Sequence, residues 1–310
     1  MILSVSRRTD IPAYFSHWFF QRLEEGYVLV RNPRNPHQVS RVELNPSVVD
    51  GIVFWTKNPL PMLDKLDRLQ EYAYYVQFTL TPYGQDSEPG VPSKGKVVIP
   101  VFQRLSEVVG PHRVIWRYDP ILLSPKYTLE YHIRYFEELA KRLSLYTEKC
   151  VISFLDQYRK IQRNMEAFHL QVPTLESQDT LAKVFSQIAH SYGLEIETCA
   201  EGIDLESYGI QHSRCVDDRL FSRLLGRPLL AEKDRNQRQE CGCAESIYIG
   251  VYNTCRNGCR YCYANFSPAT VAANCTKCDP SSPLLLGQLG PEDKVVFRKT
   301  QSLLSDQLSF

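Results

Sequence analysis

The segment Arg113-Val-Ile-Trp116, followed by Arg117-Tyr-Asp-Pro120, shows the pattern that decides the fold of this chain. A short apolar run ends abruptly in charged residues. The run is rich in β-branched and aromatic residues without strict alternation, which is typical of a strand buried on both faces, as in a parallel sheet. The same pattern recurs at Ile2–Ser6, Gly51–Trp55, Ala73–Leu80, Cys150–Leu155, Leu194–Thr198 and Ser246–Tyr252.

Helical patterns lie between these runs. Apolar residues follow helical spacing over residues 15–23, 129–143 and 181–188, and Gly26 and Gly193 are placed to end the first and the last of these helices. About seven strands that alternate with helices predict an α/β fold. We expect a full or partial β/α (TIM-like) barrel rather than an open sheet.

One segment departs from this alternation. Residues 27–44 are expected to form a β-hairpin around Asn32-Pro-Arg-Asn-Pro-His37. The remaining organisation follows from the barrel interpretation. Residues 1–230 would form its main body, residues 241–270 a closing strand and a cysteine-rich loop, and residues 271–310 a C-terminal extension of the same domain.

Composition excludes several classes of protein. The 310 residues include 36 Lys and Arg against 35 Asp and Glu, a formal charge of +1, which argues against a large basic face for nucleic acid. No apolar run approaches the roughly 20 residues that span a bilayer. Charged residues follow Met1 too soon for a secretory signal. We therefore expect a cytoplasmic protein that does not enter membranes and whose substrate is a small molecule rather than nucleic acid.

Polar residues at the ends of the predicted strands are candidate site residues. A single polar ending marks only a strand that leaves the core, but the carboxyl ends of barrel strands meet at one mouth, and seven such endings predict a shared polar site. Arginines there would pair with the carboxylate of a cofactor or an anionic substrate, and Asp119 would orient Arg117. The candidates are Arg7, Arg8, Asp10, Lys57, Asn58, Tyr83, Arg117, Asp119, Asp156 and Glu201.

Nine of the ten cysteines lie between residues 199 and 278. A chain of this length without an export signal does not need disulfide bonds, so clustered thiols indicate metal chemistry. Cys255, Cys259 and Cys262 have the spacing C-x3-C-x2-C, which can hold three irons of a [4Fe–4S] cluster and leave the fourth open. A zinc site needs a fourth ligand, for which Cys275 or Cys278 is the candidate.

Four other thiols are candidates for a second metal site, namely Cys199, Cys215, Cys241 and Cys243. They could ligate an auxiliary iron–sulfur cluster or a structural zinc, or they could be scattered buried cysteines. The pair Cys275 and Cys278 could instead complete a site with Cys241 and Cys243. Cys150 opens an apolar run and is expected in the core.

The stretch Cys255-Arg-Asn-Gly-Cys259-Arg-Tyr-Cys262 resembles the signature of radical S-adenosylmethionine enzymes, with Tyr261 as the aromatic residue before the third cysteine. The resemblance implies a [4Fe–4S] cluster whose open iron binds S-adenosylmethionine and cleaves it after one-electron reduction. It also implies an electron donor such as flavodoxin or ferredoxin. The motif lies near the C-terminus, so a circular permutation is expected, with residues 246–252 as the first barrel strand.

Longer stretches resemble an uncharacterised bacterial family catalogued as domain of unknown function 1848. They are Ser6-Arg-Arg-Thr-Asp-Ile-Pro12, Val53-Phe-Trp-Thr-Lys-Asn-Pro59, Trp116-Arg-Tyr-Asp-Pro120 and Cys255–Asn265.

Two functions follow as hypotheses. The first is a radical enzyme, with catalytic candidates Arg7, Lys57, Arg117 and Asp119 and cofactor-binding candidates Tyr261, Arg8 and Asn58. The alternative is a non-catalytic iron–sulfur or zinc protein that carries electrons or senses redox state. A carrier would not need charged side chains that point into one cavity, so the polar mouth favours the enzyme.

Overall fold

An eight-stranded parallel sheet forms the centre of the structure, a computed structural model that describes residues 1–156 and 161–305. The α/β class predicted from the sequence is confirmed. Each of the seven predicted runs overlaps one of the strands, and the short β9 was not predicted. In sheet order the strands are β10 (Ile247–Tyr248), β1 (Ile2–Val5), β4 (Gly51–Thr56), β5 (Tyr74–Thr79), β6 (Val114–Ile121), β7 (Lys149–Phe154), β8 (Glu195–Thr198) and β9 (Gln211–His212).

The strand order places a segment from late in the chain next to the N-terminal strand. β10, late in the sequence, pairs in parallel with β1, and Leu3 lies opposite Ile247. In the part of the chain that the structure describes, β9 and β10 form the two edges and do not pair. The sheet is therefore open along that edge, and closure into a complete barrel stays a prediction.

Two strands differ in length from the sequence expectation. β6 was expected to end at Trp116 but continues to Ile121, with an irregular register between Tyr118 and Ile121. Arg117 and Asp119 thus lie within the last part of the strand rather than after it. β10 contains only Ile247 and Tyr248 of the predicted run 246–252.

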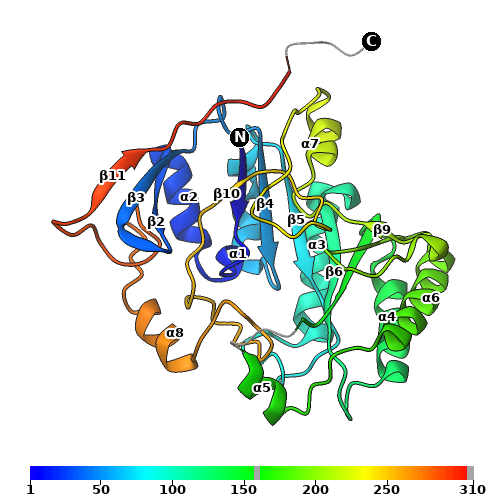
Figure 1. The fold of residues 1–310 in the computed structure, drawn as a ribbon. Coiled ribbons are helices and arrows are strands. Elements are labelled where there is room, and N and C mark those ends of the chain that lie inside the picture. Colours follow the sequence, from blue (N-terminus) through cyan, green and yellow to red (C-terminus); the bar gives the residue numbers. More distant parts are fainter. Residues whose placement is uncertain (157–160, 306–310) are drawn as a thin grey trace.

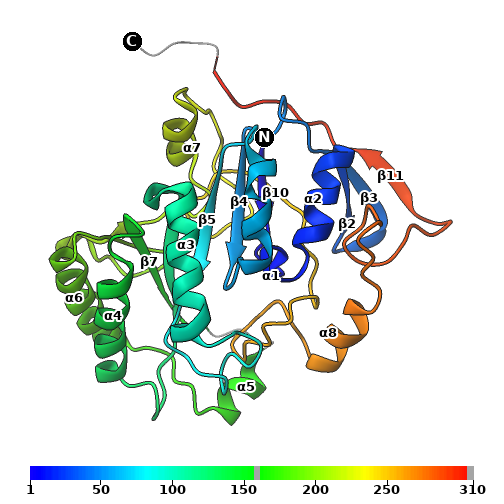
Figure 2. The same cartoon turned by 180° about the vertical axis from the view of Figure 1, so that it is seen from behind.

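The predicted helices are present. Gly26 ends the first in a left-handed conformation with φ of 77°, which glycine adopts without steric cost. Figure 2 shows α2, α3 and α4 in front of the sheet, on the face that is at the back in Figure 1. The α-helices are α1 (Ile11–Tyr14), α2 (Ser16–Glu25), α3 (Ile99–Val109), α4 (Leu129–Leu143), α5 (Gln162–Ala167), α6 (Leu175–Ser191), α7 (Asp218–Leu225) and α8 (Pro268–Cys275). Short 3-10 helices span Leu60–Leu69, Pro111–Arg113 and Glu206–Tyr208, and a π-helical turn spans Lys94–Val98.

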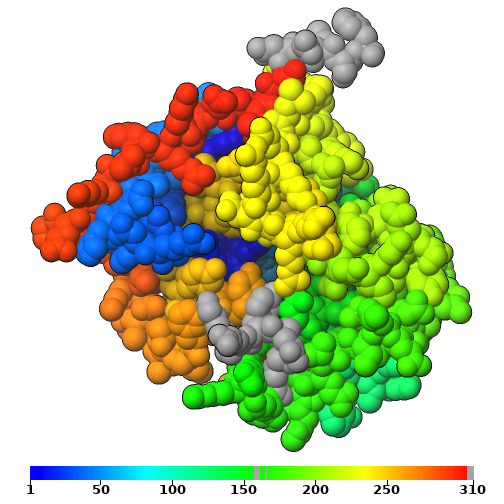
Figure 3. All heavy atoms as spheres, viewed as in Figure 1, coloured from blue at the N-terminus to red at the C-terminus, as the bar shows by residue number. Residues whose placement is uncertain are grey.

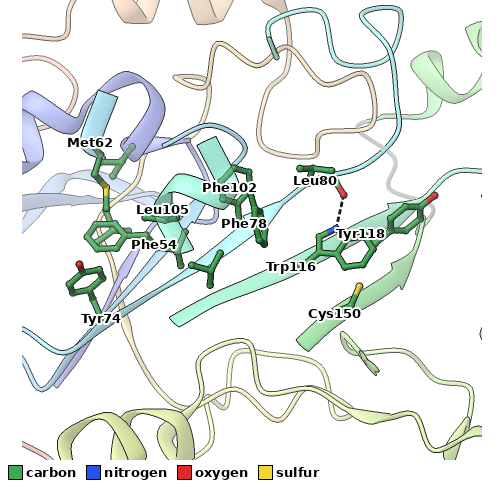
Figure 4. Close-up of a cluster of buried hydrophobic side chains, with 14 of the residues drawn as sticks. Phe54, Met62, Tyr74, Phe78, Leu80, Phe102, Leu105, Trp116, Tyr118 and Cys150 are labelled. Carbon is green, nitrogen blue, oxygen red and sulfur yellow. Dashed lines mark hydrogen bonds between the residues drawn. The ribbon is translucent and has the colours of Figure 1, made fainter. Parts of the chain in front are cut away.

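Aromatic residues fill the core between the sheet and these helices. Trp116 of β6 is fully buried, stacks on Phe136 of α4, and donates a hydrogen bond from Nε1 to the Leu80 carbonyl at 2.9 Å (Figure 4). Phe136 in turn stacks on Phe185 of α6 with ring centroids 4.0 Å apart. Cys150 lies in this core, as expected.

The other face of the sheet is also covered. Val53, Tyr75 and Ile115 point to this side and pack against Phe221 of α7 and Cys215. Figure 1 shows the yellow segment that includes α7 crossing in front of the strands. Burial on both faces explains why the strand sequences do not alternate between apolar and polar residues.

The predicted hairpin is confirmed as β2 (Tyr27–Asn32) and β3 (Asn35–Glu43). The C-terminal segment adds β11 (Lys294–Phe297), parallel to β3, so the hairpin becomes a separate three-stranded sheet. Among the described residues, no helix has the length and apolar character needed to cross a membrane.

Candidate functional site

A cavity of about 360 Å³ opens at the carboxyl ends of the parallel strands. Figure 3 shows a hollow on this side, where dark blue N-terminal residues are visible between the yellow and orange segments. The structure brings Arg7, Lys57 and Arg117 into the same cavity as the loop 255–262, called the triplet loop here because it carries the three cysteines Cys255, Cys259 and Cys262. The predicted residues that line it are Arg7, Arg8, Asp10, Lys57, Arg117, Asp119, Asp156, Cys199, Glu201, Cys241, Cys255, Cys259, Tyr261 and Cys262.

Six candidates lie outside the cavity lining, and two of them, Cys275 and Cys278, are described below. Asn58 accepts a hydrogen bond from the Leu60 backbone, at the start of a 3-10 helix. Tyr83 is buried and donates to the Pro120 carbonyl at 2.7 Å. Cys215 and Cys243 are also buried, behind the cavity wall.

The triplet loop is tied to the ends of β1 and β4. Asn257 within it donates from Nδ2 to Asp10 at 3.0 Å and accepts from the Tyr14 hydroxyl at 2.8 Å. The same Asp10 oxygen accepts the Lys57 amide at 2.8 Å. Gly258 turns the loop with φ of +63°, a left-handed angle that suits glycine. Asp10 therefore fixes the loop relative to two neighbouring strands.

A second connection runs through Gly90. Its amide donates to the Asn257 carbonyl at 2.9 Å, and a Cβ atom at this position would lie 2.1 Å from the Arg256 carbonyl oxygen. Only glycine permits this approach of the two backbones. Sequence analysis missed Gly90 and Asn257 because neither has a local signal.

The three thiols of the loop face the cavity as neutral groups. Burial raises the pKa of each, that of Cys259 to about 12. In the described residues, no three Cys, His, Asp or Glu side chains already surround one ion-sized point. Three sulfurs on one loop with an open side toward a cavity nevertheless fit the donor set of a [4Fe–4S] cluster, which is larger than an ion and deprotonates its ligands on binding.

Glu88 organises the cations next to this loop, and sequence analysis missed it. Its buried carboxylate binds Lys57 at 2.8 Å, Lys94, and the hydroxyls of Thr81 and Tyr261. Burial alone would raise the pKa of Glu88, but the two lysines outweigh it and lower the pKa to about 2. The hydroxyl of Tyr261 is thus engaged by Glu88, while its ring lies 5.6 Å from the Lys57 ammonium.

Arg117 and Asp119 form the ion pair that was expected. Asp119 accepts from Arg117 Nε at 3.0 Å and also binds Ser153. Burial acts to raise the pKa of Asp119, but Arg117 and Ser153 lower it overall. Trp55, another residue that sequence analysis missed, holds two guanidiniums, since Arg7 and Arg117 lie 4.5 and 5.3 Å from its ring centroid.

Glu201 adds a carboxyl group to the cavity wall. It accepts the Phe154 amide at 2.9 Å. Burial raises the pKa of Glu201 to about 8, so this group is mostly protonated at neutral pH. It can therefore donate a hydrogen bond to a ligand where an ordinary glutamate could only accept one.

The four other thiols meet on one side of the cavity. The sulfurs of Cys199 and Cys215 lie 3.2 Å apart. Cys215 also contacts Cys243, and Cys243 contacts Cys241. The hydrogen bond to Cys243 lowers the pKa of Cys241 to about 7.

Cys275 and Cys278 do not line the cavity, and Cys275 packs next to the start of the triplet loop. The Cys275 thiol donates to the Thr254 carbonyl, and the Cys278 thiol donates to the Asn274 carbonyl. Both pack against the main hydrophobic core. This placement gives no support to a shared site with Cys241 and Cys243.

Residues 2–264 match the family described as domain of unknown function DUF1848. No curated protein matches the sequence. Because the match covers most of the chain and includes the strand ends and the triplet loop, the protein belongs to the DUF1848 family.

Proposed function

We propose that this protein is a radical S-adenosylmethionine enzyme in which Cys255, Cys259 and Cys262 hold a [4Fe–4S] cluster. One observation carries the proposal: three thiols of a single loop open into the same cavity as Arg7, Lys57 and Arg117. When bound, such a cluster supplies the electron that cleaves the carbon–sulfur bond of S-adenosylmethionine.

The cavity residues would bind and orient the ligands. Arg8 lines the cavity 4.9 Å from the Tyr252 ring centroid, and within the described residues its guanidinium makes no hydrogen bond or ion pair. It is therefore available for a carboxylate, either that of S-adenosylmethionine or that of an anionic substrate. Tyr261 and Lys57 lie next to the loop, where the shared Glu88 fixes their positions.

The proposal includes a permuted β/α barrel. In that interpretation β10 is the first strand, because it precedes the triplet loop, and β1 is the second. The pairing of β10 with β1 supports this order, since a cyclic permutation of the chain leaves these strands adjacent. The residues Ser6–Asp10 would then occupy the mouth next to the cluster.

Anaerobic reconstitution tests the function. The protein is incubated with iron and sulfide, counted for both, and then mixed with dithionite and S-adenosylmethionine while 5′-deoxyadenosine is measured. We expect at least about four irons per chain and formation of 5′-deoxyadenosine that Cys259→Ala abolishes and the core variant Cys150→Ala retains. Iron binding without cleavage would favour the electron carrier or redox sensor, and cleavage by Cys259→Ala would contradict the cluster assignment.

A further inference from the structure

We infer that Cys199, Cys215, Cys241 and Cys243 form a second metal centre with four thiolate ligands, and that Arg7 and Arg117 neutralise its negative charge. This centre would use a different part of the cavity lining from the triplet loop. The inference goes beyond the proposed function and does not depend on it.

Three backbone segments bring these sulfurs together. Cys199 follows β8, and the Ser213 amide donates to the Thr198 carbonyl at 2.7 Å, which places the segment with Cys215 beside it. The Ala244 amide donates to the Val216 carbonyl at 2.9 Å, which places Cys243 next to Cys215. The cluster is thus built by tertiary hydrogen bonds and not by one loop.

Both arginines direct hydrogen-bond donors at sulfur. Arg117 donates from Nη1 to Cys215 at 2.9 Å, and Arg7 donates from Nη2 to Cys243 at 3.0 Å. A thiol sulfur is a weak acceptor, whereas a thiolate accepts strong charge-assisted bonds. Two guanidiniums in this position are therefore placed to stabilise anionic sulfurs, such as the thiolates of a metal site.

Arg7 is a partly buried cation whose guanidinium also contacts the Trp55 ring. Among the described residues it forms no ion pair with a carboxylate, and its Nε is buried without a hydrogen-bond partner. A cation that is partly withdrawn from water without an anion is unfavourable. A metal resolves this imbalance, because coordinated thiols lose their protons. With four thiolates, either Zn²⁺ or an oxidised [4Fe–4S]²⁺ core leaves two negative charges beside Arg7 and Arg117, of which Arg117 also pairs with Asp119.

Cys150 provides an internal comparison. It is buried like Cys215, but it lies in the apolar core, and no guanidinium in the described residues donates a hydrogen bond to it. Buried cysteines that act only as small hydrophobic groups are expected to look like Cys150. The hydrogen bonds from Arg7 and Arg117 thus distinguish this set of cysteines from ordinary core thiols. We call the set the four-thiol group: Cys199, Cys215, Cys241 and Cys243.

The sulfurs are in contact in the order 199, 215, 243 and 241, and they do not yet surround a single point. Metal binding would draw the outer pair, Cys199 and Cys241, toward each other. Both of these line the cavity, whereas Cys215 and Cys243 are buried behind it. The metal would therefore be reached from the cavity side.

Metal analysis of a protein that lacks the triplet tests the inference. The variant Cys255→Ala/Cys259→Ala/Cys262→Ala is reconstituted anaerobically with zinc or with iron and sulfide, and metal per chain is measured by mass spectrometry. We expect about one zinc, or about four irons with equal sulfide. Adding Cys215→Ser and Cys243→Ser should remove the metal, and adding Cys150→Ala instead should leave it in place. A folded triplet variant that binds neither metal would overturn the inference.

The unmodified protein gives a second count if the triplet variant does not fold. About eight irons, or about four irons with one zinc, would support two centres, and Cys215→Ser/Cys243→Ser should lower the count by about four irons or one zinc. A count that this double variant leaves unchanged would contradict the second centre. In zinc-loaded protein, Arg7→Gln should weaken retention of the metal against a chelator by about 10- to 100-fold; unchanged retention would remove the role given to Arg7. Failure of S-adenosylmethionine cleavage would leave all of these counts intact, so the two proposals are tested separately.

Discussion

The two groups of thiols differ in how the chain builds and balances them. The triplet comes from eight consecutive residues, and in the described part of the chain no guanidinium donates to its sulfurs. The cations that act on Cys259 are Lys57 and Lys94, which share the single negative charge of Glu88. The four-thiol group comes from three segments and has two guanidiniums directly on sulfur. The first is open to a ligand, whereas the second is enclosed and compensated by the protein.

This difference suggests that the two groups of thiols hold metal centres with different roles. An open set of three donors suits a metal centre that exchanges a small molecule, because one coordination position stays available. A set of four donors with matched cations suits a centre that the protein alone saturates. The predictions that follow test the features that distinguish the two sides of the cavity.

The largest effect is expected from the triplet itself. Cys259→Ala leaves two sulfurs on the loop, too few to hold the cluster, so reductive formation of 5′-deoxyadenosine should be lost completely. Cys278→Ser, which lies outside both groups, should keep it. Chromatographic quantification of 5′-deoxyadenosine after dithionite reduction measures the difference. Equal loss in both variants would mean that the triplet has no special role.

Glu88→Gln should have the next largest effect, on stability. The change leaves Lys57 and Lys94 in a buried site without their shared anion, which costs about 3–5 kcal/mol. Glu138→Gln, which breaks an exposed pair with Arg142, should cost no more than about 0.5 kcal/mol. Urea unfolding at pH 7 measures both. Similar losses of unfolding free energy in the two variants would show that the ion pairs of Glu88 with Lys57 and Lys94 do not stabilise the fold.

The pH dependence of the stability difference between the wild type and Glu88→Gln is a separate test. The lysines lower the pKa of Glu88 from about 4.5 to about 2, so its ionised form stabilises the folded state. The stabilisation is present above pH 4.5 and is lost as pH falls toward 2. The gap in unfolding free energy between the wild type and Glu88→Gln should therefore be constant from pH 7 to 5 and narrow below pH 4.5. A gap that widens on acidification would contradict the ion-pair account.

A smaller effect is expected at the support of the triplet loop. In Gly90→Ala the added methyl group meets the Arg256 carbonyl, so the loop must shift at a cost of about 1–3 kcal/mol. Gly95→Ala, where a Cβ atom meets nothing within 4 Å, should not be destabilising. Thermal unfolding of the two variants shows the contrast. Equal destabilisation would mean that the close approach at Gly90 does not hold the loop.

Sequence patterns predicted those parts of the molecule that depend on local order. The apolar runs indicated the parallel strands, and their polar ends indicated residues that the structure brings into one cavity, such as Arg7, Lys57 and Arg117. The triplet could also be recognised from its spacing in the sequence, since all of its residues lie on one loop. In these cases the residues that act together are either adjacent in sequence or fixed by the parallel sheet.

The remaining features depend on contacts between distant segments. Glu88 lies in a loop with no motif, yet it binds Lys57 and Tyr261, 31 and 173 residues away. Trp55 looked like an ordinary strand residue, although its ring holds two guanidiniums. The continuation of β6 through Pro120 was missed because proline lacks the amide that a strand normally donates.

Electron paramagnetic resonance of the reduced protein, with and without S-adenosylmethionine, tests the central claim most directly. The account predicts a cluster signal that changes when the cofactor is added, because it binds at an iron that Cys255, Cys259 and Cys262 leave open. The part of the signal that responds should be absent from Cys259→Ala. A reduced protein with about four irons or more whose signal is the same with and without S-adenosylmethionine would contradict the account.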